Sequence, residues 1–353
     1  MLQDDALQAV DMMQRGIRLI SANSLDSAEA CLTEALSGLN NLVSQTLFGL
    51  GKLAYKRSEY DKALFFLARA RDADPSLADA FALTAEIYLT LKEPERAKEW
   101  CEKALEVNWN VRDAHICLSR VNLPGPGYYA NIEMIQKFLR PRTYLEIGVE
   151  TGKTLKYAAD DTMAIGVDPE PAVNVPLGCL TRVYEIKSDD FFNLTDLAKE
   201  FAGHSVELAF IDGMHLFEFA LRDFINIEKY CSEDSIVLVH DCCPLDDITA
   251  ARERITEFWS GDIWKLIVCL KKYRPDLRIN VVETAPTGLA IITGLNSQSH
   301  ILTDNLEGIY EEFINMDYEY LNEDKAGKLN LVPNDWGVIE GILTKTEAVQ
   351  TDE

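Results

Sequence analysis

Two short stretches of the sequence carry side chains that could bind a cation and move a proton. Asp212 and His215 follow the apolar run 206–211, and His240 and Asp241 follow the apolar run 235–239. Carboxylate oxygens suit hard divalent cations such as magnesium, and an imidazole beside them would also tolerate manganese or another transition metal. The ordinary pKa of histidine, ~6.5, suits proton transfer near neutral pH. The alternatives are a helix-capping or hydrogen-bonding role for His215 and a purely structural role for His240.

A glycine-containing turn lies earlier in the sequence and bears on which nucleotide the chain could bind. It reads Glu146-Ile-Gly148-Val-Glu150-Thr-Gly152. A dinucleotide fold would place glycine where Glu150 stands, so that the backbone can approach a pyrophosphate. Two carboxylates would repel a pyrophosphate but suit the sulfonium and ammonium of S-adenosylmethionine. The turn therefore argues against a hydride-transfer enzyme.

Two further acidic positions follow at the ends of the next apolar runs. Asp168 ends the run 163–168, and Asp189 follows the run 182–188. A carboxylate ~20 residues past the first turn can accept both hydroxyls of a ribose. The later one can reach an adenine edge. Each position alone could equally be an ordinary turn or helix cap, and only the ordered set points to a nucleoside site.

The elements that must position these residues alternate between short apolar runs and helical spacing. The expected strands span 142–149, 163–168, 182–188, 206–212 and 235–241, with helical spacing at 194–202 and 217–230 and a late hairpin formed by 278–283 and 288–294. Strands that are apolar throughout indicate a buried parallel sheet. Ligands bind at the carboxyl ends of such strands, which is where the candidate residues stand.

The first third of the chain repeats itself. Small and apolar residues recur at spacings of 34 and 35 residues over about 10–110, and Pro75 closes the central repeat. The pattern resembles the tetratricopeptide repeat, in which small residues let two helices approach closely. Such arrays generally present a concave face to a protein or peptide partner. Packing on the next domain, or formation of a homo-oligomer, is the equal alternative.

The motifs LEIGVETGKT, AIGVDP, SDDFF, FIDGMH and VLVHD resemble, in this order, the class I S-adenosylmethionine-dependent methyltransferases. Within that group they are most similar to the metal-dependent, macrocin-type sugar O-methyltransferases, over about 130–295. The resemblance implies a Rossmann-like α/β domain with a mostly parallel seven-stranded sheet and a C-terminal antiparallel hairpin. It also implies a hydroxyl acceptor on a sugar or a glycosylated small molecule.

The resemblance also assigns roles to individual residues. For the cofactor it implies that the amino-acid end is bound by Glu146, Gly148 and Gly152, and Glu150 departs from the usual glycine. It implies that Asp168 binds the ribose and that Asp189 lies near the adenine. Asp212 is a further expected cofactor residue. For catalysis it implies His215 as the base and Asp212, His240 and Asp241 as ligands of Mg²⁺ or Mn²⁺. The consecutive pair His240-Asp241 departs from an all-oxygen ligand set.

Composition sets the remaining limits. The chain has 353 residues and a formal charge of −24, which disfavours nucleic acid and anionic lipid as partners. No apolar run approaches the ~18 residues of a membrane span. The acidic N-terminus and scattered cysteines are typical of a cytoplasmic protein with reduced thiols. The expected divisions are repeats over 1–121, a linker over 122–130, the methyltransferase domain over 131–300 and a helical extension over 301–353, with a disordered tail at 344–353.

The sequence therefore predicts an O-methyltransferase placed behind a helical repeat array. Two other functions stay open at this stage. The chain could be a non-catalytic interaction scaffold with a methyltransferase-like domain. It could also methylate a protein gripped by the repeats, although the candidate metal ligands argue against this, because a deprotonated amine needs no metal to react.

Overall fold

The computed structural model describes residues 2–21, 24–178 and 180–344. The chain divides into two compact units, Met1–Val121 and Asn122–Glu353, and each is described here by itself. Residues 345–353 of the tail expected to be disordered, and Cys179, lie outside the described residues. The other seven cysteines are buried free thiols.

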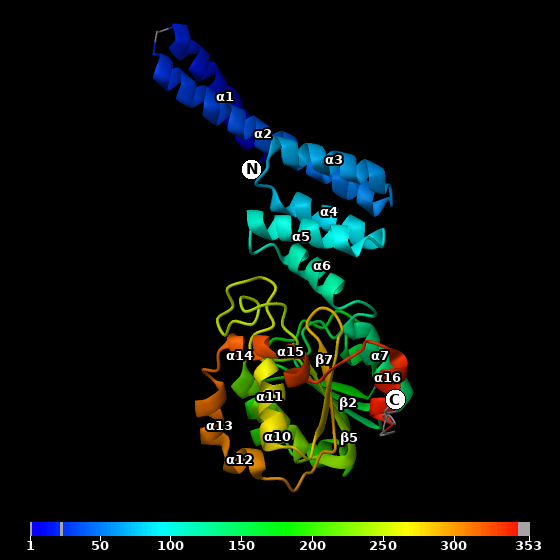
Figure 1. The fold of residues 1–353 in the computed structure, drawn as a ribbon. Helices are drawn as coiled ribbons and strands as arrows, with labels where there is room; N and C mark the ends of the chain where they lie inside the picture. Colours follow the sequence, from blue (N-terminus) through cyan, green and yellow to red (C-terminus); the bar gives the residue numbers. More distant parts are fainter. Residues whose placement is uncertain (1, 22–23, 179, 345–353) are drawn as a thin grey trace, which may run out of the picture. The chain divides into compact units, whose positions relative to one another are not determined.

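The first unit is entirely helical, and its helices pair as successive hairpins (Figure 1). They are α1 (Leu2–Ser21), α2 (Leu25–Lys56), α3 (Tyr60–Ala73), α4 (Ala78–Thr90), α5 (Pro94–Val107) and α6 (Arg112–Asn122). The helix α2 runs without a break through the expected boundary between the first and central repeats. No proline stands in this segment, whereas Pro75 lies in the break between α3 and α4.

The small residues that recur in the sequence form the helix contacts of this unit. Six of them have no exposed surface: Ala63, Leu67, Ala70, Ala97, Cys101 and Ala104. Gly51 shows why a small residue is needed, because a Cβ there would lie 2.9 Å from the Leu67 side chain. These contacts fit the expected repeat packing, and the assignment to the tetratricopeptide class remains a prediction.

The second unit is built on one mixed sheet. Its strands are β1 (Thr143–Ile147), β2 (Met163–Asp168), β3 (Thr181–Glu185), β4 (Val206–Ile211), β5 (Cys231–His240), β6 (Arg278–Val282), β7 (Leu289–Thr293) and β8 (Leu331–Val332). The order is β3-β2-β1-β4-β5-β7-β6-β8. Neighbours among β1 to β5 are parallel, and β7 is antiparallel to both β5 and β6.

The expectation of seven strands was wrong by one. The eighth strand, β8, has two residues and comes from the segment expected to be a helical extension. It pairs in parallel with β6, and Val281 and Glu283 donate backbone hydrogen bonds to Asn330 and Val332. A two-residue strand shows no alternation of apolar and polar side chains, so periodicity could not reveal it.

Helices cover both faces of the sheet (Figure 1). One face carries the larger part of the core, under α8 (Ser188–Leu194), α10 (Phe217–Glu228), α11 (Trp264–Tyr273) and α13 (Leu306–Phe313). The other face carries α7 (Tyr128–Leu139) and α16 (Trp336–Leu343). This arrangement buries parallel strands on both sides, as their continuous apolar sequences predict.

The remaining helices are short: η1 (Leu155–Tyr157), α9 (Leu197–Glu200), α12 (Ile301–Asp304), α14 (Tyr318–Glu323) and α15 (Lys325–Leu329). The helix α7 begins inside the segment expected to be a linker. The C-terminal segment is tied to that same stretch, because Asn334 donates to the carbonyls of Pro124 and Pro126 and accepts from Asn131. Within the described residues, no helix combines the length and apolarity needed to cross a bilayer.

Candidate active site

The expected metal ligands meet at the carboxyl ends of β4 and β5. One ligand atom from each of Asp212, His240 and Asp241 lies within 4.8 Å of the other two. Consecutive residues of a regular strand point to opposite faces, so His240 and Asp241 could not share a site in extended backbone. Asp241 has φ +61°, which ends the strand and turns both side chains to one side.

The Asp241 carboxylate is fully buried and only half satisfied. Its Oδ1 atom accepts a hydrogen bond of 2.5 Å from the hydroxyl of Thr287. Its Oδ2 atom has no hydrogen-bond partner among the described residues, although His215 Nδ1 and His240 Nδ1 lie 3.2 and 3.5 Å away. An anionic oxygen that is buried in this way fits a cation, because burying an unpaired charge is costly.

His240 lies between the two carboxylates. Its Nδ1 atom is 3.0 Å from Asp212 Oδ1, and its Nε2 atom is 3.3 Å from Thr287 Oγ1. Burial lowers the pKa of this imidazole, but the charges of Asp241 and Asp212 outweigh burial and raise it well above its usual range. Tyr128 stacks on the ring with a centroid distance of 3.9 Å. These three contacts together fix the orientation of the ring.

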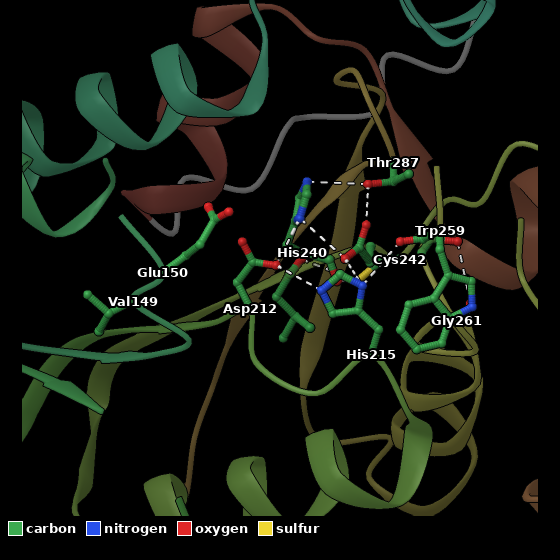
Figure 2. Close-up of polar contacts among 12 residues, drawn as sticks. Val149, Glu150, Asp212, His215, His240, Cys242, Trp259, Gly261 and Thr287 are labelled. Carbon is green, nitrogen blue, oxygen red and sulfur yellow. Dashed lines mark hydrogen bonds and ion pairs between the residues drawn. The ribbon is translucent and has the colours of Figure 1, made fainter. Parts of the chain in front are cut away.

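His215 reaches the same cluster from the loop after β4 (Figure 2). Its Nδ1 atom lies 3.2 Å from both the Trp259 carbonyl oxygen and Asp241 Oδ2. Both neighbours are acceptors, so Nδ1 carries the proton in the neutral ring, and the lone pair is on Nε2. Nε2 lies 3.8 Å from Asp212 Oδ1. The free lone pair therefore faces the candidate metal site.

The segment 259–262 holds His215 by several contacts. The Trp259 ring stacks on the imidazole at 5.3 Å. The backbone of Gly261 comes so close that a Cβ there would lie 1.7 Å from the His215 carbonyl oxygen. Asp262 accepts from Phe217 N, Arg252 and Lys265, which ties the segment to the start of α10. These contacts fix the turn that presents His215.

The turn after β1 is joined to the same site. Gly148 has φ +89°, and a Cβ there would lie 2.0 Å from the Asp212 carbonyl oxygen. Val149 N and Glu150 N donate to Asp168 Oδ2, and Glu170 N donates to Asp168 Oδ1. Asp168 therefore organises the turn with its own carboxylate. Since a carboxylate offers about four lone-pair directions, at least one stays free for a ligand.

The other expected cofactor residues have contrasting surroundings. Glu146 has no exposed surface and accepts from Tyr144 and Thr154 hydroxyls at 2.6 and 2.8 Å. Burial raises its pKa to about 8, although the two hydrogen bonds act in the opposite direction and lower the pKa. Glu150 is exposed, with φ +46°. Gly152 has φ +77°, and a Cβ there would press on three apolar side chains of the segment 173–177.

Asp189 stands apart from these residues. It lies in the first turn of α8, after β3, where Arg222 donates to both of its carboxylate oxygens at 2.9 and 2.8 Å. The hydrogen bonds from Arg222 lower its pKa, so it stays charged. The structure thus joins the metal candidates, His215 and the turn after β1, whereas the part of Asp189 in cofactor binding remains a prediction.

A comparison with protein families matches the segment that contains these residues. A family model described as a methyltransferase domain matches residues 145–242. The match begins in β1 and ends just after Asp241, so it spans the residues joined above. The chain carries a methyltransferase domain. The expectation of a methyltransferase with an α/β sheet is confirmed to this extent.

Several solved structures match parts of the chain at low identity. The cofactor-bound protein Rv0187 from MTB matches with 14% identity and a TM-score of 0.39, over 63% of this chain and 90% of its own. The O-methyltransferase TomG from Streptomyces achromogenes, in complex with SAM, matches with 13% identity and 0.38, over 56% and 89%. An O-methyltransferase from Bacillus cereus, in complex with SAH, matches with 11% identity and 0.36, over 54% and 94%. Likenesses at this level assign no residue a role.

Three residues of the site were not predicted from the sequence: Tyr128, Trp259 and Thr287. Tyr128 is the first residue of α7, and Trp259 and Thr287 lie in segments that form neither helix nor strand. Each meets its partner across more than forty residues of chain. The proline and glycine of the stretch 285–288 signalled a turn between two strands, but a turn signal does not say what the turn contacts.

Proposed function

We propose that the chain is an S-adenosylmethionine-dependent O-methyltransferase that uses a divalent cation and acts on a hydroxyl of a sugar-like small molecule. The observation that carries the proposal is the convergence of Asp212, His240 and Asp241 with His215 at the ends of β4 and β5. A buried carboxylate oxygen without a hydrogen-bond partner among the described residues supports the cation. The sugar-like acceptor comes from the resemblance in motifs.

The residues after β1 and β2 would hold the cofactor. S-adenosylmethionine, when bound, supplies the electrophilic methyl group. Asp168 keeps a free lone pair for a ribose hydroxyl, and Gly148 and Gly152 supply the positive φ angles of the turn. Glu146 has no exposed surface, so it would support the cofactor indirectly, by holding Thr154 and the turn after β1 in place. Glu150 and Asp189 are the carboxylates proposed to border the amino-acid end and the adenine.

His215 is the proposed base. An alcohol is a weak nucleophile until it loses its proton, and a divalent ion, when bound, lowers the pKa of a coordinated hydroxyl. The Nε2 lone pair of His215 would accept that proton, while the Trp259 carbonyl oxygen takes the hydrogen bond from Nδ1. Asp241 would also stabilise the imidazolium that forms.

Calorimetry tests the cofactor. S-adenosylmethionine is titrated into the full chain, with wild type, Asp168→Asn and Asp190→Asn compared. Asp190 is exposed and follows the third strand, so it is a matched control. The expected result is micromolar binding that Asp168→Asn weakens ~10-fold or more and Asp190→Asn leaves within about 2-fold, since a hydrogen bond to a charged group contributes ~1.5–3 kcal/mol. A wild type that binds no S-adenosylmethionine would overturn the proposal.

A second assay tests the reaction. The purified chain is treated with EDTA, and methyl transfer from labelled S-adenosylmethionine to a panel of sugars, glycosides and intact proteins is followed with and without added Mn²⁺. We expect label in hydroxyl-bearing small molecules only after Mn²⁺ is restored, and loss of turnover in Asp212→Asn and His215→Gln. Label in the protein fraction, transferred without metal, would instead establish the protein-directed function.

A further inference from the structure

The turn that joins β6 to β7, residues 284–288, packs directly on the turn that holds Asp241. Cys243 N donates to the Thr287 carbonyl oxygen at 2.6 Å. Gly288 has φ +76°, and a Cβ there would lie 2.6 Å from the Cys243 Cβ. The antiparallel pairing of β5 and β7 sets His240 opposite Leu289, close to this contact. The turn is therefore part of the wall of the candidate metal site.

Thr287 places its hydroxyl between two of the candidate ligands (Figure 2). The side chain is buried, with Oγ1 2.5 Å from Asp241 Oδ1 and 3.3 Å from His240 Nε2. A hydroxyl has one proton, and the short contact with an ionised carboxylate requires it. The hydroxyl can then only accept from His240, so a hydrogen bond between the two side chains requires a hydrogen on Nε2.

This arrangement favours Nδ1 as the nitrogen that would bind a cation in place of a hydrogen. With the hydrogen on Nε2, the ring offers Nδ1, which faces Asp212 Oδ1 at 3.0 Å and Asp241 Oδ2 at 3.5 Å. Those two oxygens are also the carboxylate atoms turned toward the cluster. Metal-binding histidines commonly donate their second N–H to a fixed acceptor, which orients the ring.

The same turn brings Tyr128 onto the other side of the ring. Tyr128 N donates to the Ala285 carbonyl oxygen at 3.1 Å, and the Thr284 hydroxyl donates to the Pro126 carbonyl oxygen at 2.8 Å. These two contacts fix the start of α7, from which Tyr128 stacks on His240. One turn thus sets both the hydrogen bond and the stacking of a single imidazole.

We propose that Thr287 is a positioning residue of the cation site, which holds His240 with Nδ1 toward Asp212 and Asp241 and fixes the Asp241 carboxylate at the same time. The inference rests on the proposed function, because it presumes that these three residues bind a divalent ion. It adds a specific residue and a specific ring nitrogen. Thr287 itself does not contact the ion in this proposal.

The test is binding of Mn²⁺ alone to the full chain, followed by the electron paramagnetic resonance signal of free Mn²⁺. Wild type is compared with Thr287→Val, which removes the hydroxyl at nearly constant shape, and with Thr287→Ser, which keeps it. Thr293→Val is the matched control, because Thr293 is equally buried on β7 and its hydroxyl accepts only from Arg278 among the contacts seen. Thermal unfolding of each protein shows that it is folded.

We expect Thr287→Val to raise the Kd for Mn²⁺ ~10–100-fold, with Thr287→Ser close to wild type and Thr293→Val unchanged. Equal affinity of wild type and Thr287→Val would overturn the role of Thr287 and leave the metal proposal standing. A wild type that binds no Mn²⁺ would overturn the metal-dependent function itself, and the inference with it. The two failures are thus distinct.

A measurement on the wild type does not depend on whether Thr287→Val folds. In the chain loaded with Zn²⁺ as a diamagnetic probe, ¹⁵N shifts and ring couplings report which nitrogen of each histidine carries hydrogen. His240 is assigned by the signal that Thr287→Ser perturbs most. Hydrogen on Nε2 and metal on Nδ1 support the proposal, and the opposite tautomer overturns it.

Discussion

At the scale of single residues, the site depends on backbone that leaves extended geometry at chosen points. Asp241 adopts φ +61°, which lets two consecutive side chains serve one site. Gly148 adopts φ +89° directly against the Asp212 carbonyl oxygen. The turn expected to bind the cofactor and the residue expected to bind the metal are therefore in contact through their backbones. A substitution that displaces the turn should therefore also displace Asp212.

Gly148→Ala tests that contact, with Gly203→Ala as the control. Gly203 also has positive φ, at +83°, but a Cβ there would meet nothing within 4 Å. The control should lose only the ~1–2 kcal/mol typical of a left-handed L-residue. Because the Gly148 Cβ would overlap a backbone atom, Gly148→Ala should lose at least ~2 kcal/mol more in urea unfolding.

Ligand binding by the same two variants separates the two effects. Gly148→Ala should also weaken both S-adenosylmethionine and Mn²⁺ binding, since the displaced turn carries Asp212 with it. Gly203→Ala should bind both ligands as wild type does. Equal stability losses in the two variants would show that the turn relaxes away from Asp212, and that the two parts of the site are independent.

At the scale of elements, much of the site could be predicted because parallel strands gather their carboxyl ends at one edge. The residues at the ends of the expected strands 206–212 and 235–241 did converge, and this could be predicted without detailed knowledge of the loops. The partners of these residues could not be predicted. Thr287 lies 46 residues beyond Asp241, in a turn whose own signals describe only its local backbone.

The helices of the first unit show a similar limit. The break at Pro75 could be predicted, because the proline ring cannot continue a helix. The continuity of α2 across a repeat boundary could not, because the repeat pattern suggested a turn that no proline enforces. The two-residue strand β8 is formed by pairing with β6 alone, which no local sequence pattern encodes.

A buried carboxyl group on the helix α10 should make the stability of the folded protein depend on pH. Asp223 is 2% exposed, and its Oδ1 atom has no hydrogen-bond partner within the part of the chain that the structure describes. Burial raises its pKa from 3.8 to about 7. The folded state therefore holds a proton that the unfolded state has lost. Its stabilising effect is full below pH ~4 and disappears as the pH rises through 7.

The prediction compares Asp223→Asn with wild type in urea unfolding at pH 5, 6, 7 and 8. Between pH 5 and pH 8 the wild type should lose about 2–3 kcal/mol more of its unfolding free energy than the variant, whose amide does not ionise. Glu146, with a pKa also raised by burial, contributes to both proteins equally. Parallel curves for the two proteins would show that Asp223 is hydrated or paired in solution.

At the scale of the whole molecule, the two units have separate hydrophobic cores. The clusters of the second unit draw on the sheet and the helices on its two faces. Those of the first unit draw only on α2 to α6. Every residue of the candidate site, Tyr128 included, lies in the second unit. The repeats contribute no residue to this site, and a protein or peptide partner for them stays a prediction, beside the alternatives of packing on the next domain and formation of a homo-oligomer.

A fragment spanning 122–353 tests this division. It should unfold cooperatively and bind S-adenosylmethionine and Mn²⁺ with Kd values within about 2-fold of the full chain, since all contacts of the site that we describe are internal to it and independent sites are additive. Calorimetry and the Mn²⁺ titration measure this, with near-ultraviolet circular dichroism as the control for native packing. A folded fragment that binds either ligand more than 10-fold more weakly would contradict the division, because residues 122–353 would then not be sufficient for the site.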